Sequence, residues 1–322
     1  MHRRILVTGA AGFVGSALIV ELQRIGHYVR AAVRRLPRAS LPVDTVLVGD
    51  ISSETNWSAA LDGIDTVVHL AARVHVMHDT STDPLAEFRA VNVAGTAALA
   101  RASGAMGVQR LVFVSSIKVN GEETRDRPFS ADDVPAPADP YAISKSEAEY
   151  ELRCIERQTG IDITVVRPPL VYGPGVGGNF LRLLKMIDAG IPLPFGAINN
   201  QRSMIFNGNL VSGLVACATR AEAAGKTFLI SDAQNISTPE LIECLARYLG
   251  RRARLLRIPA GLLRTLGRVA GKGAEIGRLT GSLVVDNSRL RETLGWVPPV
   301  DVTTGLRETA DWFRKTHSTS HV

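Results

Sequence analysis

Cysteine is scarce in this chain of 322 residues. Its three cysteines, Cys154, Cys217 and Cys244, lie far apart and show none of the spacings that hold a metal ion. So sparse a set argues against a disulfide framework and is typical of buried thiols in a reducing cytoplasm. Long apolar runs are also missing, since none reaches the about 20 residues that a membrane-spanning helix needs. We therefore expect a cytoplasmic protein without a transmembrane segment.

Aromatic residues make up only 5% of the chain, whereas its net charge is +6. A positive field attracts nucleic acids and anionic small molecules alike. Because the sequence contains no nucleic-acid-binding motif, we expect no nucleic-acid partner and an anionic small substrate. Residues 251–280 are locally basic and contain interspersed leucines. A lid helix with solvated arginines is the favoured interpretation of this segment, and contact with an anionic membrane surface stays open.

Short apolar segments alternate with helical patterns over the first half of the chain. This order predicts an α/β fold with a doubly wound parallel sheet. The composition changes near residue 170, where glycine and proline become frequent. We predict a sheet domain and a smaller, interleaved C-terminal domain, formed by residues 1–169 plus about 201–230 and by residues 170–200 plus 231–322, respectively. The expected strands lie near residues 5–7, 28–33, 44–48, 66–70, 111–114, 161–166 and 227–230.

A glycine-rich turn follows the first predicted strand and precedes a helical pattern. Gly9 permits the tight turn, Gly12 lets the backbone approach a pyrophosphate, and Gly15 lets the helix pack close to the strand. The free N–H groups at the start of the helix attract the same anion. Strand, turn and helix in this order predict a dinucleotide-binding site.

The second predicted strand ends in Arg34 and Arg35. An acidic residue at this position binds the ribose hydroxyls of NAD, whereas arginines hold the 2′-phosphate of NADP. Two solvated arginines at a strand end are the plain alternative. The sequence therefore favours NADP(H) as the cofactor and leaves NAD(H) open.

Other residues stand where strands of the sheet end. Asp50 follows the third strand and could bind an adenine amino group, and Ala71 and Ala72 leave room for a cofactor at the end of the fourth. Asn92 is a polar residue in an apolar helical pattern and is expected to bond backbone near the site. A metal site is not expected, because no carboxylate cluster accompanies the three nearby histidines, which are His69, His75 and His78.

The fifth strand delivers Ser115 and Ser116 at its carboxyl end. Tyr141 and Lys145 follow at the start of a helix, four residues apart and therefore on one face. A lysine ammonium beside a phenol stabilises the phenolate and lowers a pKa that is ordinarily about 10. Such a pair suits acid–base chemistry, although by itself it is more often part of a solvated surface.

Taken together in their order, these residues resemble the extended short-chain dehydrogenase/reductases, and among them the NAD-dependent epimerase/dehydratase family acting on nucleotide sugars. The resemblance runs from the glycine turn to Asp286 and Trp296 and covers nearly the whole chain. It implies a Rossmann-type fold, and a homodimer formed through helices near residues 84–106 and 141–158. The implied cofactor-binding residues are Gly9, Gly12, Phe13, Val14, Gly15, Arg34, Arg35, Asp50, Ile51, Leu70, Ala71, Ala72, Asn92, Tyr141, Lys145 and Pro168.

The same resemblance implies roles at the reacting centre. Tyr141 resembles the catalytic acid/base, Lys145 the residue that lowers its pKa and binds the nicotinamide ribose, and Ser116 the hydroxyl that binds the reacting sugar oxygen. For hydride exchange at a carbinol or ketone these three side chains suffice. The residues implied in binding the nucleotide diphosphate are Asn179, Arg202 and Arg278, and arginines suit phosphate because their geometry permits bidentate contacts.

Departures from the family pattern narrow the expected reaction. The 4,6-dehydratases carry an acidic residue directly after the hydroxyl residue, whereas Ile117 and Lys118 follow Ser116 here. We therefore expect no dehydratase. The two arginines after the second strand, and segments that resemble bacterial polysaccharide-cluster reductases, favour reduction of a UDP-4-keto-6-deoxy-N-acetylhexosamine to UDP-N-acetylquinovosamine. A UDP-hexose or UDP-N-acetylhexosamine 4-epimerase ranks second, and a non-enzymatic dinucleotide sensor is a distant third.

Overall fold

The computed structural model describes residues 2–36, 41–74, 82–269, 271 and 273–317. At its centre lies a seven-stranded sheet with the order β3-β2-β1-β4-β5-β6-β9, in which every pair of neighbours is parallel. The direction of the winding reverses between β1 and β4, and ligands bind at such a switch point beyond the carboxyl ends of the strands. The strands are β1 (Arg4–Thr8), β2 (Tyr28–Val33), β3 (Asp44–Leu47), β4 (Thr66–His69), β5 (Arg110–Val114), β6 (Asp162–Arg167) and β9 (Thr227–Leu229).

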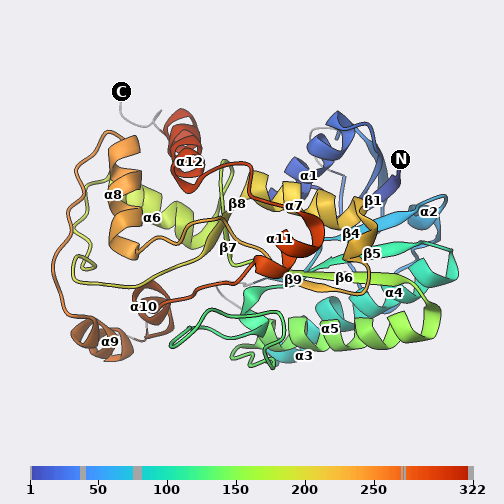
Figure 1. Ribbon diagram of the computed structural model, residues 1–322, viewed down its shortest axis with the longest axis horizontal. Coiled ribbons are helices and arrows are strands. Elements are labelled where there is room, and N and C mark those ends of the chain that lie inside the picture. The colour runs from blue at the N-terminus through green and yellow to red at the C-terminus, as the bar shows by residue number, and fades with distance from the viewer. Residues whose placement is uncertain (1, 37–40, 75–81, 270, 272, 318–322) are drawn as a thin grey trace.

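Helices cover both faces of this sheet (Figure 1). One face packs against α1 (Phe13–Arg24) and α7 (Asn207–Thr219), and the other against α4 (Thr96–Ala105) and α5 (Pro140–Thr159). The central strands consist largely of consecutive apolar residues. This composition fits strands that are buried on both faces of the sheet. The predicted doubly wound α/β fold is confirmed, including the return of residues 227–229 to the sheet edge.

The predicted helix over residues 84–106 is continuous but not uniform. It consists of α3 (Pro84–Arg89), a π-helical segment (Ala90–Gly95) and α4. A π-helical turn changes the direction of the side chains that it carries. Here it holds Asn92 with only 1% of its surface exposed.

Helix α5 begins and ends at residues that favour those positions. The side chain of Asp139 accepts a hydrogen bond from the Ala142 N–H, Pro140 occupies the first turn, and Gly160 ends the helix in the left-handed conformation at φ 74°. These end signals fix the rotation of the helix, so that Lys145 and Glu149 face the sheet.

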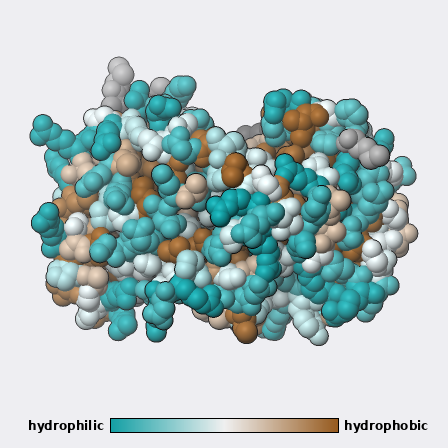
Figure 2. All heavy atoms as spheres, viewed as in Figure 1, coloured by the Kyte–Doolittle hydropathy of each residue, from teal (hydrophilic) through white to brown (hydrophobic). Residues whose placement is uncertain are grey.

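A second hydrophobic cluster lies beside the sheet. It is built mainly by α6 (Gly178–Asp188), α8 (Thr238–Tyr248) and α12 (Val302–His317). A two-stranded parallel sheet, β7 (Leu170–Tyr172) with β8 (Met204–Phe206), joins this cluster to the main one. Neither β7 nor α7 was apparent from the sequence, in which residues 170–178 are expected to form a loop. Figure 2 shows a hollow in the upper outline of the molecule between α12 and α1.

The remaining elements are short. They are α2 (Ser58–Leu61), α9 (Ala260–Val269), α10 (Gly273–Thr280), α11 (Ser288–Leu294) and the 3-10 turns Ile117–Val119 and Ala221–Ala223. No helix in the described part of the chain is long and apolar enough to cross a membrane. The described residues also contain no cluster of side chains able to hold a metal ion; His75 and His78 lie outside the described residues.

Candidate active site

The glycine turn packs tightly at the carboxyl end of β1. Gly9 has φ 66°, and the Gly12 N–H donates to its carbonyl oxygen over 2.9 Å. A Cβ atom on Gly15 would lie 2.2 Å from that same oxygen, and one on Gly9 would lie 2.8 Å from the backbone nitrogen of Ala71. Side chains are therefore excluded where the start of α1 approaches the end of β4, and the backbone is left open to an anion.

A cleft of about 690 Å³ continues from this turn along the ends of β1, β2 and β4. Its position at the switch point of the sheet and its glycine floor fit the dinucleotide predicted from the sequence. The cleft brings together most of the predicted cofactor-binding residues, namely Gly9, Gly12, Arg34, Arg35, Asp50, Ile51, Leu70, Ala71 and Ala72. Phe13, Val14 and Gly15 lie behind the turn in the first helical turn of α1, where Val14 packs against the core.

Arg34 and Asp50 are paired across the cleft. Their side chains approach to 3.6 Å, and both are mostly exposed to solvent. An exposed pair of this kind contributes little to stability. It does, however, place a carboxylate beside the arginine that the sequence offered to a 2′-phosphate, and this carboxylate opposes the binding of a further anion.

Two buried polar groups hold the end of β4 in place. The Thr8 hydroxyl accepts hydrogen bonds from the N–H groups of Leu70 and Ala71 and shares a 2.6 Å bond with His69. Burial lowers the pKa of His69 to about 3, so the imidazole is neutral. His69 is therefore a buried core residue with both ring nitrogens hydrogen-bonded.

Asn92 fixes the segment that follows β4. Its side-chain amide accepts from the Arg73 N–H over 2.8 Å and donates to the Arg73 carbonyl over 3.0 Å. It also donates to the Ser144 hydroxyl on α5. Asn92 therefore bonds backbone near the site, as expected, and ties the cleft to the helix that carries Tyr141.

The two serines after β5 have different partners. Ser115 is buried and donates to Glu149, whereas Ser116 is half-buried and is hydrogen-bonded to the Tyr141 hydroxyl. The Ser116 hydroxyl also accepts from the Lys118 N–H, which begins a 3-10 turn. The structure thus brings Ser116 and Tyr141 together at the carboxyl end of the sheet, as the sequence predicts.

Lys145 lies one turn below Tyr141 and is almost fully buried. Its Nζ is 4.1 Å from the centroid of the Phe113 ring, and burial lowers its pKa to about 7, partly opposed by the charge of Glu149. Burial also raises the pKa of Tyr141 to about 12, with a further increase from Asp139, and its bond with Ser116 acts in the opposite direction. The expectation of a lowered pKa for Tyr141 is therefore wrong for this arrangement, because desolvation outweighs any attraction from Lys145.

A buried ion pair supports this group of residues from below. Arg167, at the end of β6, donates to both carboxylate oxygens of Glu149 and to the side chain of Asn120. The carbonyl oxygen of the next residue, Pro168, accepts a hydrogen bond from the Ile117 N–H over 2.9 Å. These contacts join the ends of β5 and β6 to α5, and so set the position of Ser116 relative to Tyr141.

Lys118 stands directly beside the reacting centre. Its ammonium group contacts the carboxylate of Asp139 and lies 3.1 Å from that of Glu122. Asp139 caps α5 and is one of the charges that raise the pKa of Tyr141. The position directly after Ser116, where the dehydratase pattern has an acid, is held by the buried Ile117.

Two of the three residues predicted to bind the nucleotide diphosphate are in contact. Arg202 donates to the backbone carbonyls of Arg278 and Gly281. Burial lowers the pKa of Arg202, and the charge of Glu122 opposes this shift. Asn179 lies in the first turn of α6 and is exposed. No described hydrogen bond connects Asn179 to the two arginines.

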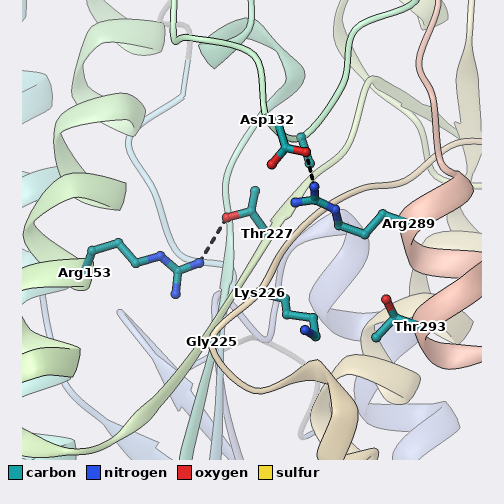
Figure 3. A pocket seen from close by; sticks show the side chains of 8 residues that line it. Asp132, Arg153, Gly225, Lys226, Thr227, Arg289 and Thr293 are labelled. Carbon is teal, nitrogen blue, oxygen red and sulfur yellow. Dashed lines mark hydrogen bonds and ion pairs between the residues drawn. The ribbon is translucent and has the colours of Figure 1, made fainter.

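A second cavity, of about 470 Å³, opens at the edge of the sheet beside β9 (Figure 3). Arg153 enters it from α5 and Arg289 from α11, with Lys226 between them. Arg289 is paired with Asp132, and Arg153 bonds Glu156 and the Thr227 hydroxyl. Because both guanidinium groups already have partners, this cavity gives no indication of a ligand.

Several residues of the site were not predicted. Val33, Val48 and Val91 line the cleft, and Thr8 supports its floor. The valines lack any polar signal, because an apolar wall residue and a core residue look alike in a sequence. Thr8, the last residue of β1 and directly before the first glycine, carries the one recognisable signal.

Comparisons with known proteins agree with this geometry. The family model described as "NAD dependent epimerase/dehydratase family" matches residues 5–231. The chain is 42% identical over 318 residues to a UDP-glucose 4-epimerase of Vibrio cholerae, covering 97% of this chain and 96% of that protein. It is 26% identical to N-acetyl-alpha-D-glucosaminyl-diphospho-ditrans,octacis-undecaprenol 4-epimerase of Escherichia coli O157:H7, with 97% and 96% covered.

Among solved structures, MoeE5 in complex with UDP-glucuronic acid and NAD superposes with a TM-score of 0.78 at 28% identity, covering 97% of this chain and 99% of that one. The fold, the family match over residues 5–231 and the similarity along nearly the whole chain agree. The chain belongs to the NAD-dependent epimerase/dehydratase family.

Proposed function

We propose that this protein is an NAD-dependent enzyme acting at C4 of a UDP-sugar, and that its reaction is 4-epimerisation. The observation that carries the proposal is the hydrogen-bonded pair of Ser116 and Tyr141 at the carboxyl end of β5, with Lys145 one helical turn away. The similarity to the UDP-glucose 4-epimerase of Vibrio cholerae along nearly the whole chain supports this choice of reaction.

Each of the three side chains has a separate task. Tyr141 transfers a proton to or from the O4 oxygen of the sugar, and Ser116 holds that oxygen at hydrogen-bonding distance. Lys145, when protonated, is a buried cation that stabilises negative charge near the phenol. NAD supplies the chemistry of taking a hydride from C4 and returning it.

The cofactor cleft favours NAD over NADP. Gly9, Gly12 and Gly15 leave the backbone accessible to a pyrophosphate, and Asp50 places a carboxylate beside Arg34. This carboxylate opposes a 2′-phosphate, so the preference for NADP expected from Arg34 and Arg35 is not supported. The NAD in the MoeE5 complex is in keeping with this choice.

Two arginines would supply positive charge for the nucleotide diphosphate. Arg202 contacts the backbone of Arg278, and guanidinium groups suit a diphosphate because they permit bidentate contacts. We assign these two arginines, with Asn179 at the start of α6, to the diphosphate of the substrate. Helices α4 and α5 would form the interface of a homodimer, and the sheet domain and C-terminal domain would divide the work of binding cofactor and substrate.

Reduction of a UDP-4-keto sugar is the second candidate. Arg34 and Arg35 both line the cleft, which suits an enzyme that exchanges its cofactor in each turnover. Both reactions use the same three side chains. Dehydration is not proposed, because Ile117 stands directly after Ser116, where an acid would be required.

One set of assays separates these possibilities. An epimerase interconverts UDP-glucose and UDP-galactose, or their N-acetyl forms, without added NADH, whereas a reductase oxidises added NAD(P)H only when a UDP-4-keto sugar is present. Tyr141→Phe should abolish turnover while NAD binding is retained. Tyr150→Phe, an exposed tyrosine on the same helix, is the matched control and should behave as the parent. Turnover by the Tyr141 variant would refute the proposed role of the phenol.

A further inference from the structure

An exposed apolar stripe runs along α9. Leu262, Leu266 and Val269 are 52%, 54% and 85% exposed, and Leu256 ahead of the helix is 51% exposed. Positions 262, 266 and 269 are spaced four and three residues apart, so the three side chains share one face of the helix.

The opposite face of α9 is already used for packing. Leu263 is buried, and a Cβ atom on Gly267 would lie 2.8 Å from the side chain of Ile276 on α10. The helix is therefore held against its neighbour by one set of apolar residues and presents a second set outward. Because this second set makes no contribution to the core, folding does not explain its apolar character.

The surroundings of the stripe are positively charged. The sequence contains no acidic residue between positions 251 and 274. Two of its arginines are paired, Arg251 with Asp188 and Arg264 with Glu123. The remaining ones are exposed and take part in no ion pair within the described part of the chain; these are Arg252, Arg254, Arg257 and Arg268.

We propose that α9 and the segment before it dock this protein on the surface of an anionic phospholipid bilayer. The leucines and the valine enter the boundary between headgroups and acyl chains, and the unpaired arginines contact the lipid phosphates. Both parts of the surface are needed, since each alone binds a bilayer only weakly.

Other occupants fit the surface less well. In a symmetric contact with a second copy, each stripe would bring its own arginines against those of its partner, and like charges repel. A nucleic acid would contact the arginines but would leave the apolar side chains without a role, because no aromatic ring stands among them for a base to stack on.

The docking surface is connected to the substrate side of the protein. Arg264 of α9 is paired with Glu123, which belongs to the loop that leads to Tyr141. The carbonyl of Arg278 on α10 accepts from Arg202. Figure 1 shows α9 at the end of the molecule remote from α4, so that docking through α9 leaves the proposed dimer helices uncovered.

Sedimentation with lipid vesicles tests the proposal on the full chain. The parent protein should bind vesicles of phosphatidylcholine mixed with phosphatidylglycerol, and should bind pure phosphatidylcholine vesicles at least about tenfold more weakly. Added salt should release it. The double variant Leu262→Gln/Leu266→Gln should lose about tenfold in vesicle affinity, and Arg257→Gln/Arg268→Gln should lose a similar factor on the mixed vesicles alone.

Control variants separate docking from general changes of surface. Val20→Gln and Arg24→Gln, both on α1, alter an exposed valine and an exposed arginine away from α9 and from the proposed dimer helices, and should bind as the parent does. Leu266→Trp provides a second measurement. If the stripe enters the bilayer, the fluorescence emission of the introduced tryptophan should shift to shorter wavelength when mixed vesicles are added. Unchanged vesicle binding by the leucine variant would overturn the proposal. So would a change from dimer to monomer in that variant without vesicles, or equal competition by RNA.

Discussion

Removing the carboxylate of Glu149 should destabilise this protein by more than the loss of one ordinary hydrogen bond would. Glu149 and Arg167 are 8% and 5% exposed, and the guanidinium donates to both carboxylate oxygens. Ser115 donates to the same carboxylate, and Asn120 accepts from the other side of the guanidinium. Glu149→Ala leaves Arg167 as a buried charge with only the Asn120 oxygen beside it.

The expected magnitude follows from this burial. Breaking a buried ion pair by removal of one partner costs about 3–5 kcal/mol, because the remaining charge loses both its partner and access to water. For a chain of 322 residues, with an unfolding entropy of about 2.1 cal/mol/K per residue, that loss corresponds to a decrease in Tm of about 4–7 °C. The variant Glu151→Ala removes an exposed carboxylate from the same helix, one that lies 3.7 Å from Arg101. It should change the free energy of unfolding by no more than about 1 kcal/mol.

Urea denaturation followed by circular dichroism measures both variants. A third protein, Glu149→Leu/Arg167→Met, removes both charges and should be more stable than Glu149→Ala, because no buried charge is then left unpaired. A loss below about 1 kcal/mol in Glu149→Ala, or a double variant less stable than the single one, would refute the reasoning.

Three further perturbations test other parts of the site. Gly15→Ala places a Cβ atom 2.2 Å from the carbonyl oxygen of Gly9, and should abolish NAD binding in a calorimetric titration; at Gly12 the corresponding distance is 3.1 Å, so Gly12→Ala should retain more affinity. Lys145 has a folded-state pKa of about 7 against an ordinary value of 10.5, so the unfolded chain binds more protons between these values and stability rises with pH. Lys145→Met should flatten the rise of the unfolding free energy from pH 7 toward 10, and an unchanged slope would contradict the low pKa. His69 has a folded-state pKa of about 3 against 6.5, so stability falls as the pH decreases from 6.5 to 3. His69→Gln should reduce this acid sensitivity in urea titrations at successive pH values, and an equally steep fall in the variant would show that other groups cause it.

The order of local signals was enough to predict the sheet and the cofactor cleft. Gly9, Gly12 and Gly15 have one structural use in that spacing, since each position excludes a side chain for a different reason. The residues at the ends of parallel strands meet at one edge of the sheet, and Asp50, Ala71 and their neighbours accordingly line one cleft.

Some elements could not be predicted because their stability comes from distant partners. The strand Leu170–Tyr172 is too short to show a period, and it forms by pairing with Met204–Phe206. The helix Asn207–Thr219 is apolar around most of its circumference because it is buried between the sheet and other helices. Its sequence therefore lacks the amphipathic pattern of a surface helix.

The sequence by itself determined the family, the doubly wound fold and the positions of Ser116, Tyr141 and Lys145 along the chain, because these depend on spacing. Tertiary structure alone decided that Ser116 faces Tyr141 while Ser115 faces Glu149. It also decided the pKa values of the site. Desolvation depends on everything packed around a group, and here it raises the pKa of Tyr141 and lowers that of Lys145. The four-residue spacing of these two side chains in the sequence could not reveal either shift.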